Sequence, residues 1–251
     1  MCVKRLIVGN WKMHGRGENL ADIEQLAQEL AKRAKNGPDV VICPPAILLR
    51  DASRIVQAVQ RPLNLEVGAQ DCAAQADGPF TGDLSAAMLR ESGASYVILG
   101  HSERRCGHRE AGECIQRKIK AALQAGLIPI VCFGEDARHR FSNQAVSAVL
   151  DQIHACMPAL EGAHVVAAYE PVWAIGSGST PTSDQIAEMH EAIRGALRAQ
   201  GGREGLQILY GGSVRASNCV GLLAIPGVDG LLVGAASLDT AAFLSIISAA
   251  A

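Results

Sequence analysis

Eight short runs of mainly aliphatic residues recur along the chain, and a longer stretch separates each run from the next. The runs cover residues 5–9, 39–43, 65–69, 96–100, 128–133, 165–169, 206–210 and 230–234. This alternation indicates strands joined by helices, and therefore a parallel sheet. The runs are apolar almost throughout, as expected for strands that are buried on both faces. Eight such units in 251 residues predict an α/β fold, a (β/α)8 parallel eight-stranded barrel with outer helices.

The stretches between the runs carry helix signals. Thr182 and Gln185 have the spacing of a capping box at the start of a helix, and Ser237 is predicted to cap the last helix. Apolar residues recur at helical spacing in two sets, Leu20, Ile23, Leu26, Ala27, Leu30 and Ala34, and Ile115, Ile119, Ala122 and Leu123.

A doubly wound open sheet is the main alternative to the barrel. No G-x-G-x-x-G motif follows the first apolar run, which disfavours a dinucleotide-binding fold of that kind. The sequence contains no linker and no low-complexity segment. Residues 1–251 are therefore predicted to form a single barrel domain.

Composition excludes several classes of protein. A hydrophobic fraction of 49 % argues against disorder, while a net charge of −2 and 4 % aromatic residues give no sign of a nucleic-acid partner. No apolar run reaches the roughly 18 residues of a membrane span, and the N-terminal run is too short for a signal peptide. The eight cysteines form no C-x-x-C pair, which argues against a zinc site and a disulfide framework. Reduced, mostly buried thiols in a cytoplasmic protein are expected.

The segment 168–176, A-Y-E-P-V-W-A-I-G, predicts a catalytic carboxylate. Glu170 is the first charged residue after an apolar strand, and Pro171 biases its backbone towards an extended conformation. The following residues 176–179, G-S-G-S, bend at low cost. A fixed carboxylate beside a movable cover is what proton abstraction in a closed site requires.

Further polar groups follow the other predicted strands. In a barrel, the carboxyl ends of the strands meet at one face, so Asn10, Lys12, His101 and Glu103 are expected near Glu170. Glycine-rich turns at 211–213 and 234–235 suit a phosphate, which needs several backbone N–H donors. Singly, these features are compatible with a surface lysine, a core histidine and ordinary turns. The other six histidines are expected at the surface or behind the site: His14, His108, His139, His154, His164 and His190.

At these residues the chain resembles the triosephosphate isomerases. The matching motifs are N-W-K-M at 10–13, F-T-G at 80–82, G-H-S-E-R-R at 100–105, C-F-G-E at 132–135, Y-E-P-V-W-A-I-G at 169–176, Y-G-G-S-V at 210–214 and V-G-A-A-S-L at 233–238. The resemblance implies a TIM barrel that interconverts dihydroxyacetone phosphate and glyceraldehyde 3-phosphate, a reaction of glycolysis and gluconeogenesis. It implies no cofactor and no metal, because the reaction is only a proton transfer.

The resemblance also implies roles for the catalytic residues. Glu170 would carry the proton between neighbouring carbons, and His101 would polarise the oxygens as a neutral imidazole. Triosephosphate isomerase is itself the established example of a carboxylate base with a neutral imidazole. Lys12 would stabilise the enediolate, and Asn10 would orient Lys12 and the substrate. Apart from the resemblance, Glu103 is expected to be structural and to pair with Lys12 or with an arginine.

Phosphate binding is implied for four backbone N–H groups, those of Gly176, Ser213, Gly234 and Ala235. The residues around Gly176 would form a lid that donates hydrogen bonds to the residues after the seventh strand. Pro181 stands at one of the lid's two donor positions and has no N–H, so Tyr210 loses that bond. The other donor, Gly178, keeps its bond to Ser213. His14, Ala235 and Ser179 are further departures from the family's common residues.

The family is typically homodimeric, so a homodimer is implied. The loop from Asp77 to Asp83 would insert into the partner near Asn10 and His101, with Thr81 as its anchor. Asp83 is expected to pair with Arg104. The implied ligand is a small sugar phosphate, with neither nucleic acid nor membrane as a partner. Two alternative functions stay open at this stage: an isomerase of a four-carbon sugar phosphate, and a non-catalytic phosphate-binding homologue.

Overall fold

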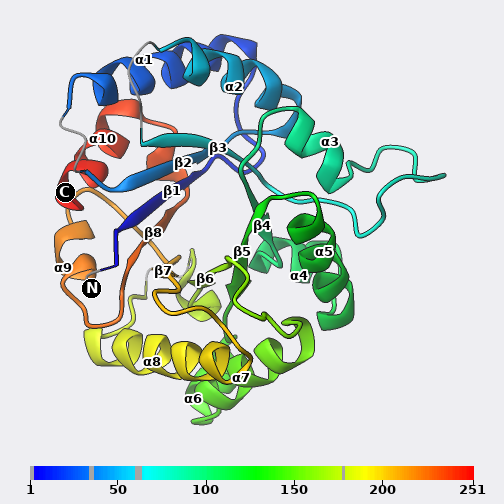
Figure 1. Cartoon of the computed structure of the whole chain (residues 1–251). Helices are drawn as coiled ribbons and strands as arrows, with labels where there is room; N and C mark the ends of the chain where they lie inside the picture. The colour runs from blue at the N-terminus through cyan, green and yellow to red at the C-terminus, as the bar shows by residue number, and fades with distance from the viewer. Residues whose placement is uncertain (1–2, 34–36, 60–63, 177–178) are drawn as a thin grey trace.

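Eight parallel strands close into a barrel in the computed structural model, which describes residues 3–33, 37–59, 64–176 and 179–251. Each strand pairs with its neighbours in chain order, and the last strand pairs with the first (Figure 1). The predicted runs are confirmed, three with identical bounds and the others within two residues. The strands are β1 Leu6–Asn10, β2 Asp39–Cys43, β3 Leu65–Ala69, β4 Tyr96–Leu99, β5 Ile128–Phe133, β6 Val166–Tyr169, β7 Ile208–Tyr210 and β8 Gly230–Val233.

Closure of the barrel depends on a close approach of two backbones. Leu6 of β1 is in register with Gly230 of β8. A Cβ added at Gly230 would lie 1.9 Å from the carbonyl oxygen of Leu6. Only glycine therefore allows the first and last strands to pair at this point.

The strands separate two apolar cores because successive side chains point to opposite faces of a strand. The larger core lies between the strands and the surrounding helices and includes Ile7, Val40, Tyr169 and Tyr210. The smaller set is Leu6, Val8, Val41, Cys43, Tyr96, Ile98, Ile130, Cys132, Val166, Ala168, Leu209 and Leu232. This second set alternates with the first along the strands and fills the barrel. Burial on both faces explains why the strands carry no alternating polar pattern.

A ring of helices surrounds the barrel (Figure 1). The α-helices are α1 Leu20–Ala31, α2 Leu49–Ala58, α3 Ala86–Glu91, α4 Ser102–Gly107, α5 Gly112–Gln124, α6 Ala137–Phe141, α7 Ala145–Cys156, α8 Ser183–Ala199, α9 Cys219–Leu223 and α10 Thr240–Ala249. Single 3-10 turns are η1 Gly17–Asn19, η2 Ala46–Leu48, η3 Val172–Ala174 and η4 Ala235–Ser237. Both predicted apolar helix faces are buried in α1 and α5, and Ala34 lies outside the described residues.

One of the two predicted helix caps is confirmed. The Thr182 hydroxyl accepts a bond from the Gln185 N–H at 3.3 Å, and the Gln185 side chain accepts one from the Thr182 N–H at 2.9 Å. The prediction for Ser237 is wrong. Its hydroxyl donates to the Gly234 carbonyl oxygen at 2.7 Å, and the carboxylate of Asp239 caps α10 instead.

The described cysteines carry no disulfide. All seven are free, and five of them are buried: Cys43, Cys72, Cys132, Cys156 and Cys219. Cys2 lies outside the described residues. Within the described ranges, none of the helices combines the length and apolar character needed to cross a membrane.

His190 is buried behind the site and does not lie at the surface, which is one of the two placements predicted for this histidine. It is 0 % exposed, on the inner face of α8. Its Nδ1 lies 3.0 Å from the Gly227 carbonyl oxygen, and its ring meets Tyr169 edge-on at 5.9 Å. Its Nε2 has no hydrogen-bond partner among the described residues. Burial lowers the pKa of His190 from 6.5 to about 4.

We expect His190 to make the fold less stable in mild acid. The unfolded chain binds a proton at His190 below pH 6.5, whereas the folded chain does so only near pH 4. The free energy of unfolding should be greatest above pH 6.5 and fall by roughly 3 kcal/mol as the pH approaches 4. Urea unfolding across this range should show a flatter pH profile for His190→Gln than for the wild type. His154→Gln, which changes an exposed histidine of α7, is the control. If the free energy of unfolding falls equally steeply with pH in the wild type and in His190→Gln, the prediction is contradicted.

Candidate functional site

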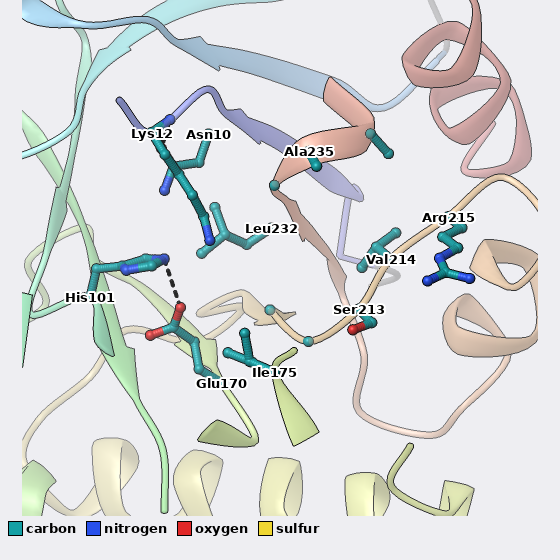
Figure 2. A pocket seen from close by; sticks show the side chains of 14 residues that line it. Asn10, Lys12, His101, Glu170, Ile175, Ser213, Val214, Arg215, Leu232 and Ala235 are labelled. Carbon is teal, nitrogen blue, oxygen red and sulfur yellow. Dashed lines mark hydrogen bonds and ion pairs between the residues drawn. The ribbon is translucent and has the colours of Figure 1, made fainter. Parts of the chain in front are cut away.

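A cavity of about 460 Å³ opens at the carboxyl ends of the strands (Figure 2). Its size suits a small ligand. It is lined by Asn10, Lys12, His101, Glu170, Ile175, Gly211, Gly212, Ser213, Val214, Arg215, Leu232, Gly234, Ala235 and Ala236. Seven of the predicted site residues are therefore brought together: Asn10, Lys12, His101, Glu170, Ser213, Gly234 and Ala235. Gly176, Glu103 and Tyr210 do not line the cavity.

Asn10 and Lys12 are held by side-chain hydrogen bonds to the backbone. Asn10 ends β1 in the interior-facing phase, and its Oδ1 accepts a bond from the Lys12 N–H at 2.9 Å. Gln70 donates to the carbonyl oxygen of Lys12 at 2.8 Å. These bonds hold Lys12 at φ +54°, in the left-handed region that is uncommon for residues other than glycine. The Lys12 side chain extends from the end of β1 towards His101 and Glu170 and lines the cavity (Figure 2).

Glu103 supports Lys12 from α4, the helix that follows β4 in the chain order. Its Oε1 lies 2.7 Å from the Lys12 Nζ, so Lys12 is the partner among the two alternatives predicted for Glu103, Lys12 or an arginine. Partial burial opposes ionisation of Glu103, but the hydrogen bond and charge of Lys12 prevail and lower the pKa of this carboxyl. Glu103 is 57 % exposed at its side chain, so the pair is a positioning contact and contributes little to stability.

Glu170 is the most enclosed charged group of the cavity, at 2 % exposure. It follows Val166 and Ala168 in the interior-facing phase of β6, which directs its side chain inwards. Its Oε1 lies 2.9 Å from the His101 Nε2, and its Oε2 accepts a bond from the Ser102 N–H at 2.9 Å. Both carboxylate oxygens thus have a donor, which offsets part of the cost of burying a charge.

His101 lies between β4 and α4, and its hydrogen bonds define its tautomer. Its Nδ1 accepts a bond from the backbone N–H of Glu103 at 3.3 Å and therefore carries no hydrogen. The ring hydrogen is then on Nε2, which faces Glu170. In this arrangement the imidazole donates one hydrogen bond from Nε2 into the cavity.

The backbone of Glu170 is fixed by the neighbouring strand. Its N–H donates to the carbonyl oxygen of Phe133 at 2.7 Å. A Cβ added at Gly134 would lie 1.8 Å from the carbonyl oxygen of Glu170. Gln152 holds Gly134 in turn, with bonds of 3.1 and 2.7 Å to its N–H and carbonyl groups. The position of the carboxylate therefore depends on a glycine 36 residues earlier in the chain.

A buried carboxylate anchors the segment that follows Glu170. Glu135 accepts bonds from the Trp173 indole at 2.8 Å and the Tyr169 hydroxyl at 3.1 Å. The Arg140 guanidinium also pairs with Glu135 and lies over the Trp173 ring, 5.5 Å from its centroid. These contacts hold the 3-10 turn η3 against the ends of β5 and β6.

Free backbone donors line the opposite side of the cavity. The N–H groups of Ser213, Gly234 and Ala235 have no acceptor within the described part of the chain. Ala235 is the first residue of η4, where an N–H has no partner within the helix. Gly211 is different, because its N–H donates to the Tyr169 carbonyl oxygen at 2.7 Å. The predicted turns therefore present unpaired donors to the cavity, as a phosphate site requires.

Two other predicted residues, Tyr210 as a support residue and Gly176 as a phosphate-binding residue, lie outside the cavity lining. Tyr210 points away from the barrel interior, and a Cβ at Gly212 would lie 2.2 Å from its hydroxyl oxygen. Gly176 has a φ of +73°, a conformation suited to glycine. Residues 177 and 178 lie outside the described ranges, so the expected bond from Gly178 to Ser213 stays a prediction.

Five lining residues were not singled out from the sequence: Ile175, Val214, Arg215, Leu232 and Ala236. Leu232 continues the interior-facing phase of β8, and that phase would have identified it. Arg215 lies two residues beyond the turn at 211–213, where no sequence period applies. Within the described residues, no group of three or more histidine, cysteine or acidic side chains is arranged to hold a metal ion.

Comparison with known proteins identifies the family. The model of the triosephosphate isomerase family matches residues 5–250. The chain belongs to the triosephosphate isomerase family. It is 47 % identical to triosephosphate isomerase of Ruegeria sp. (strain TM1040) over 251 residues, which covers 99 % of this chain and 98 % of the relative. It is also 47 % identical to that of Acidiphilium cryptum (strain JF-5) over 257 residues, with 98 % of each chain covered.

A solved structure agrees with this assignment. The crystal structure of triosephosphate isomerase from Bartonella henselae aligns with a TM-score of 0.88 at 38 % sequence identity. The alignment covers 98 % of this chain and 99 % of that one. The predicted family and the closed eight-stranded barrel are thereby confirmed.

We expect Gly134→Ala to lower isomerase activity without unfolding the barrel. The added methyl group must displace the Glu170 backbone, and a shift of about 1 Å in a catalytic group can cost roughly 10²-fold in rate. The measurement is steady-state kinetics, with circular dichroism to confirm the fold. Gly195→Ala is the matched control, because a Cβ at Gly195 in α8 meets no atom within 4 Å. Unchanged kinetics for Gly134→Ala would show that this contact does not set the position of Glu170.

Proposed function

We propose that the protein interconverts dihydroxyacetone phosphate and D-glyceraldehyde 3-phosphate by proton transfer through an enediolate. The observation that carries this proposal is the pairing of the enclosed Glu170 carboxylate with the His101 Nε2 at 2.9 Å. Membership of the triosephosphate isomerase family supplies the substrate. Proton transfer between adjacent carbons needs a base, a hydrogen-bond donor and a positive charge, and all three line one cavity.

Glu170 is the base in this proposal. Its carboxylate removes a proton from the carbon beside the substrate carbonyl and returns it to the neighbouring carbon. Both of its oxygens are hydrogen-bonded, to the His101 Nε2 and the Ser102 N–H, so the carboxylate must exchange the His101 contact for the substrate. The His101 Nε2–H is then available to the substrate oxygens.

His101 and Lys12 stabilise the negative charge that develops on the substrate oxygens. A neutral imidazole donates a hydrogen bond and moves protons between the two oxygens. The Lys12 ammonium supplies a full positive charge, and Glu103 and Asn10 keep it in place. Asn10 also orients the substrate.

Backbone N–H groups of the protein are assigned to binding the phosphate group of the substrate. The unpaired N–H groups of Ser213, Gly234 and Ala235 support this assignment, and Gly176 would add a fourth donor when the lid closes. Tyr210 has a supporting role beneath this turn. Closure of a lid over the cavity would exclude water and protect the enediolate, a use of loop motion for which this family is an established example.

We expect Glu170→Gln to reduce turnover on glyceraldehyde 3-phosphate, because an amide cannot accept the proton. Loss of a positioned general base should cost about 10²–10⁴ in kcat. Glu188→Gln is the control, since this exposed carboxylate of α8 lies outside the cavity. Near-normal turnover by Glu170→Gln would refute the assignment. Parallel assays on a four-carbon sugar phosphate would test the preference for three carbons.

A homodimer is part of the same proposal. The segment between β3 and α3 projects from the barrel and contains the loop from Asp77 to Asp83 (Figure 1). A groove of about 550 Å³ lies beside Lys12 and Met13, and Met13 is 95 % exposed. Exposed apolar side chains near the loop and the groove support an interface between copies: Met13, Ile47, Phe80, Leu84 and Met88.

The proposed anchor of this interface is Thr81. It lies in the projecting loop and would enter the partner's groove near Asn10 and His101. Within one chain, Arg104 pairs with Asp71 at 2.9 Å and Glu110 at 2.7 Å, so its expected pairing with Asp83 stays a prediction across the interface.

We expect Thr81→Arg to convert the dimer into a monomer with reduced activity. The large charged side chain does not fit a closed interface. Sedimentation velocity at micromolar concentration gives the oligomeric state. Ala224→Arg is the control, because this exposed residue follows α9 on the opposite side of the barrel (Figure 1). A fully active monomer of the unaltered protein would exclude the interface.

Two broader assignments complete the proposal. Residues 1–251 act as one barrel domain, in keeping with the family match over residues 5–250. A cytoplasmic location is in keeping with the free state of the seven described cysteines.

A further inference from the structure

Arg215 lies at the opposite end of the cavity from His101 and Glu170 (Figure 2). It follows Ser213 by two residues, in the turn between β7 and α9. Asn218 holds this turn with both ends of its amide group. Its Oδ1 accepts a bond from the Arg215 N–H at 2.8 Å, and its Nδ2 donates to the Ser213 carbonyl oxygen at 2.9 Å. One side chain therefore fixes the backbones of Arg215 and Ser213 relative to each other.

The charge of Arg215 is not compensated by a neighbour. The charged side chains that line the cavity are Lys12, Glu170 and Arg215. Lys12 has a carboxylate partner in Glu103 at 2.7 Å. Within residues 3–33, 37–59, 64–176 and 179–251, no carboxylate lies within 4 Å of the Arg215 guanidinium. The end of the cavity with the unpaired backbone donors is thus also its most positive end.

Full charge and backbone donors act differently on an anion. Backbone N–H groups carry only partial charges and fix the geometry of a bound phosphate. A guanidinium adds a whole charge and two parallel donors. A phosphate monoester carries about 1.5 to 2 negative charges at pH 7. An exposed cation at the rim of a site mainly changes encounter and retention of the ligand, and its effect declines with salt.

The geometry points to Arg215 as a specificity residue that selects dianionic phosphate ligands through its uncompensated charge. The identity of the substrate rests on the function proposed above. Arg215 does not touch the reacting carbons, which lie at the Glu170 end of the cavity. Its charge therefore lowers KM and raises the affinity for phosphate, and it leaves kcat unchanged.

The test compares Arg215→Gln with two matched variants. We expect Arg215→Gln to raise the KM for glyceraldehyde 3-phosphate and the Kd for inorganic phosphate about three- to tenfold, with kcat within about twofold of the wild type. Arg215→Lys keeps the charge and should retain most of the affinity. Arg198→Gln removes the same charge from an exposed position in α8, outside this cavity, and should change neither constant.

Ionic strength and direct binding complete the test. The KM of the wild type should rise more steeply with salt than that of Arg215→Gln. Isothermal titration with inorganic phosphate measures binding without turnover, so a failure of the proposed function would leave this measurement intact. Equal phosphate affinities for Arg215→Gln and Arg198→Gln would overturn the inference. So would an Arg215→Lys variant as weak as Arg215→Gln, or a loss confined to kcat.

Discussion

The pairing of β1 with β8 is the constraint on which the rest of the structure depends. An open sheet would leave two unpaired edges, and the carboxyl ends of its strands would form a line. Closure turns that line into a ring, so that residues 10 and 235, at opposite ends of the sequence, line one cavity. The absence of a side chain at Gly230 permits the closing contact, since any Cβ there would collide with the Leu6 carbonyl oxygen.

The phase of side chains along each strand then connects packing to chemistry. Leu6 and Val8 fill the barrel, and Asn10 in the same phase reaches the cavity. Val166 and Ala168 do the same for Glu170. The polar site is therefore the last layer of an apolar core, and it needs no separate scaffold. The cost of placing a carboxylate there is reduced by two donors from the junction of β4 and α4, the His101 side chain and the Ser102 N–H.

Most of the fold and the site could be predicted from the sequence, because both follow from patterns that are local in the chain. Strands buried on both faces are continuous apolar runs, and strand ends mark one face of a barrel. The prediction of strand ends and of cavity-lining residues fails where contacts between residues distant in the sequence determine the structure. β7 begins at Ile208 and not at residue 206. The carboxylate of Asp229, which is distant in the chain, accepts a bond from the Ile208 N–H at 2.9 Å. Arg215 borders the cavity only because the barrel closes.

His190 lies behind the site, one of the two placements predicted for it, and Ile186, Met189, His190 and Ile193 have the spacing of a buried helix face. The predicted cap at Ser237 fails for a different reason. Asp239, two residues later, caps α10 because its carboxylate reaches the helix N–H groups. Residue type alone does not distinguish two capping candidates that lie two residues apart.

The contact between Gly134 and the Glu170 carbonyl has a consequence for transferring this site to another scaffold. Glu170 follows β6, but the space for its backbone is provided by Gly134, which follows β5. A design that grafts only the segment carrying the carboxylate would import the functional group without the gap that seats it. The smallest transferable unit is a pair of adjacent strand ends, with Gln152 as the clamp behind them. A single motif in the sequence therefore understates how much of the barrel one carboxylate requires.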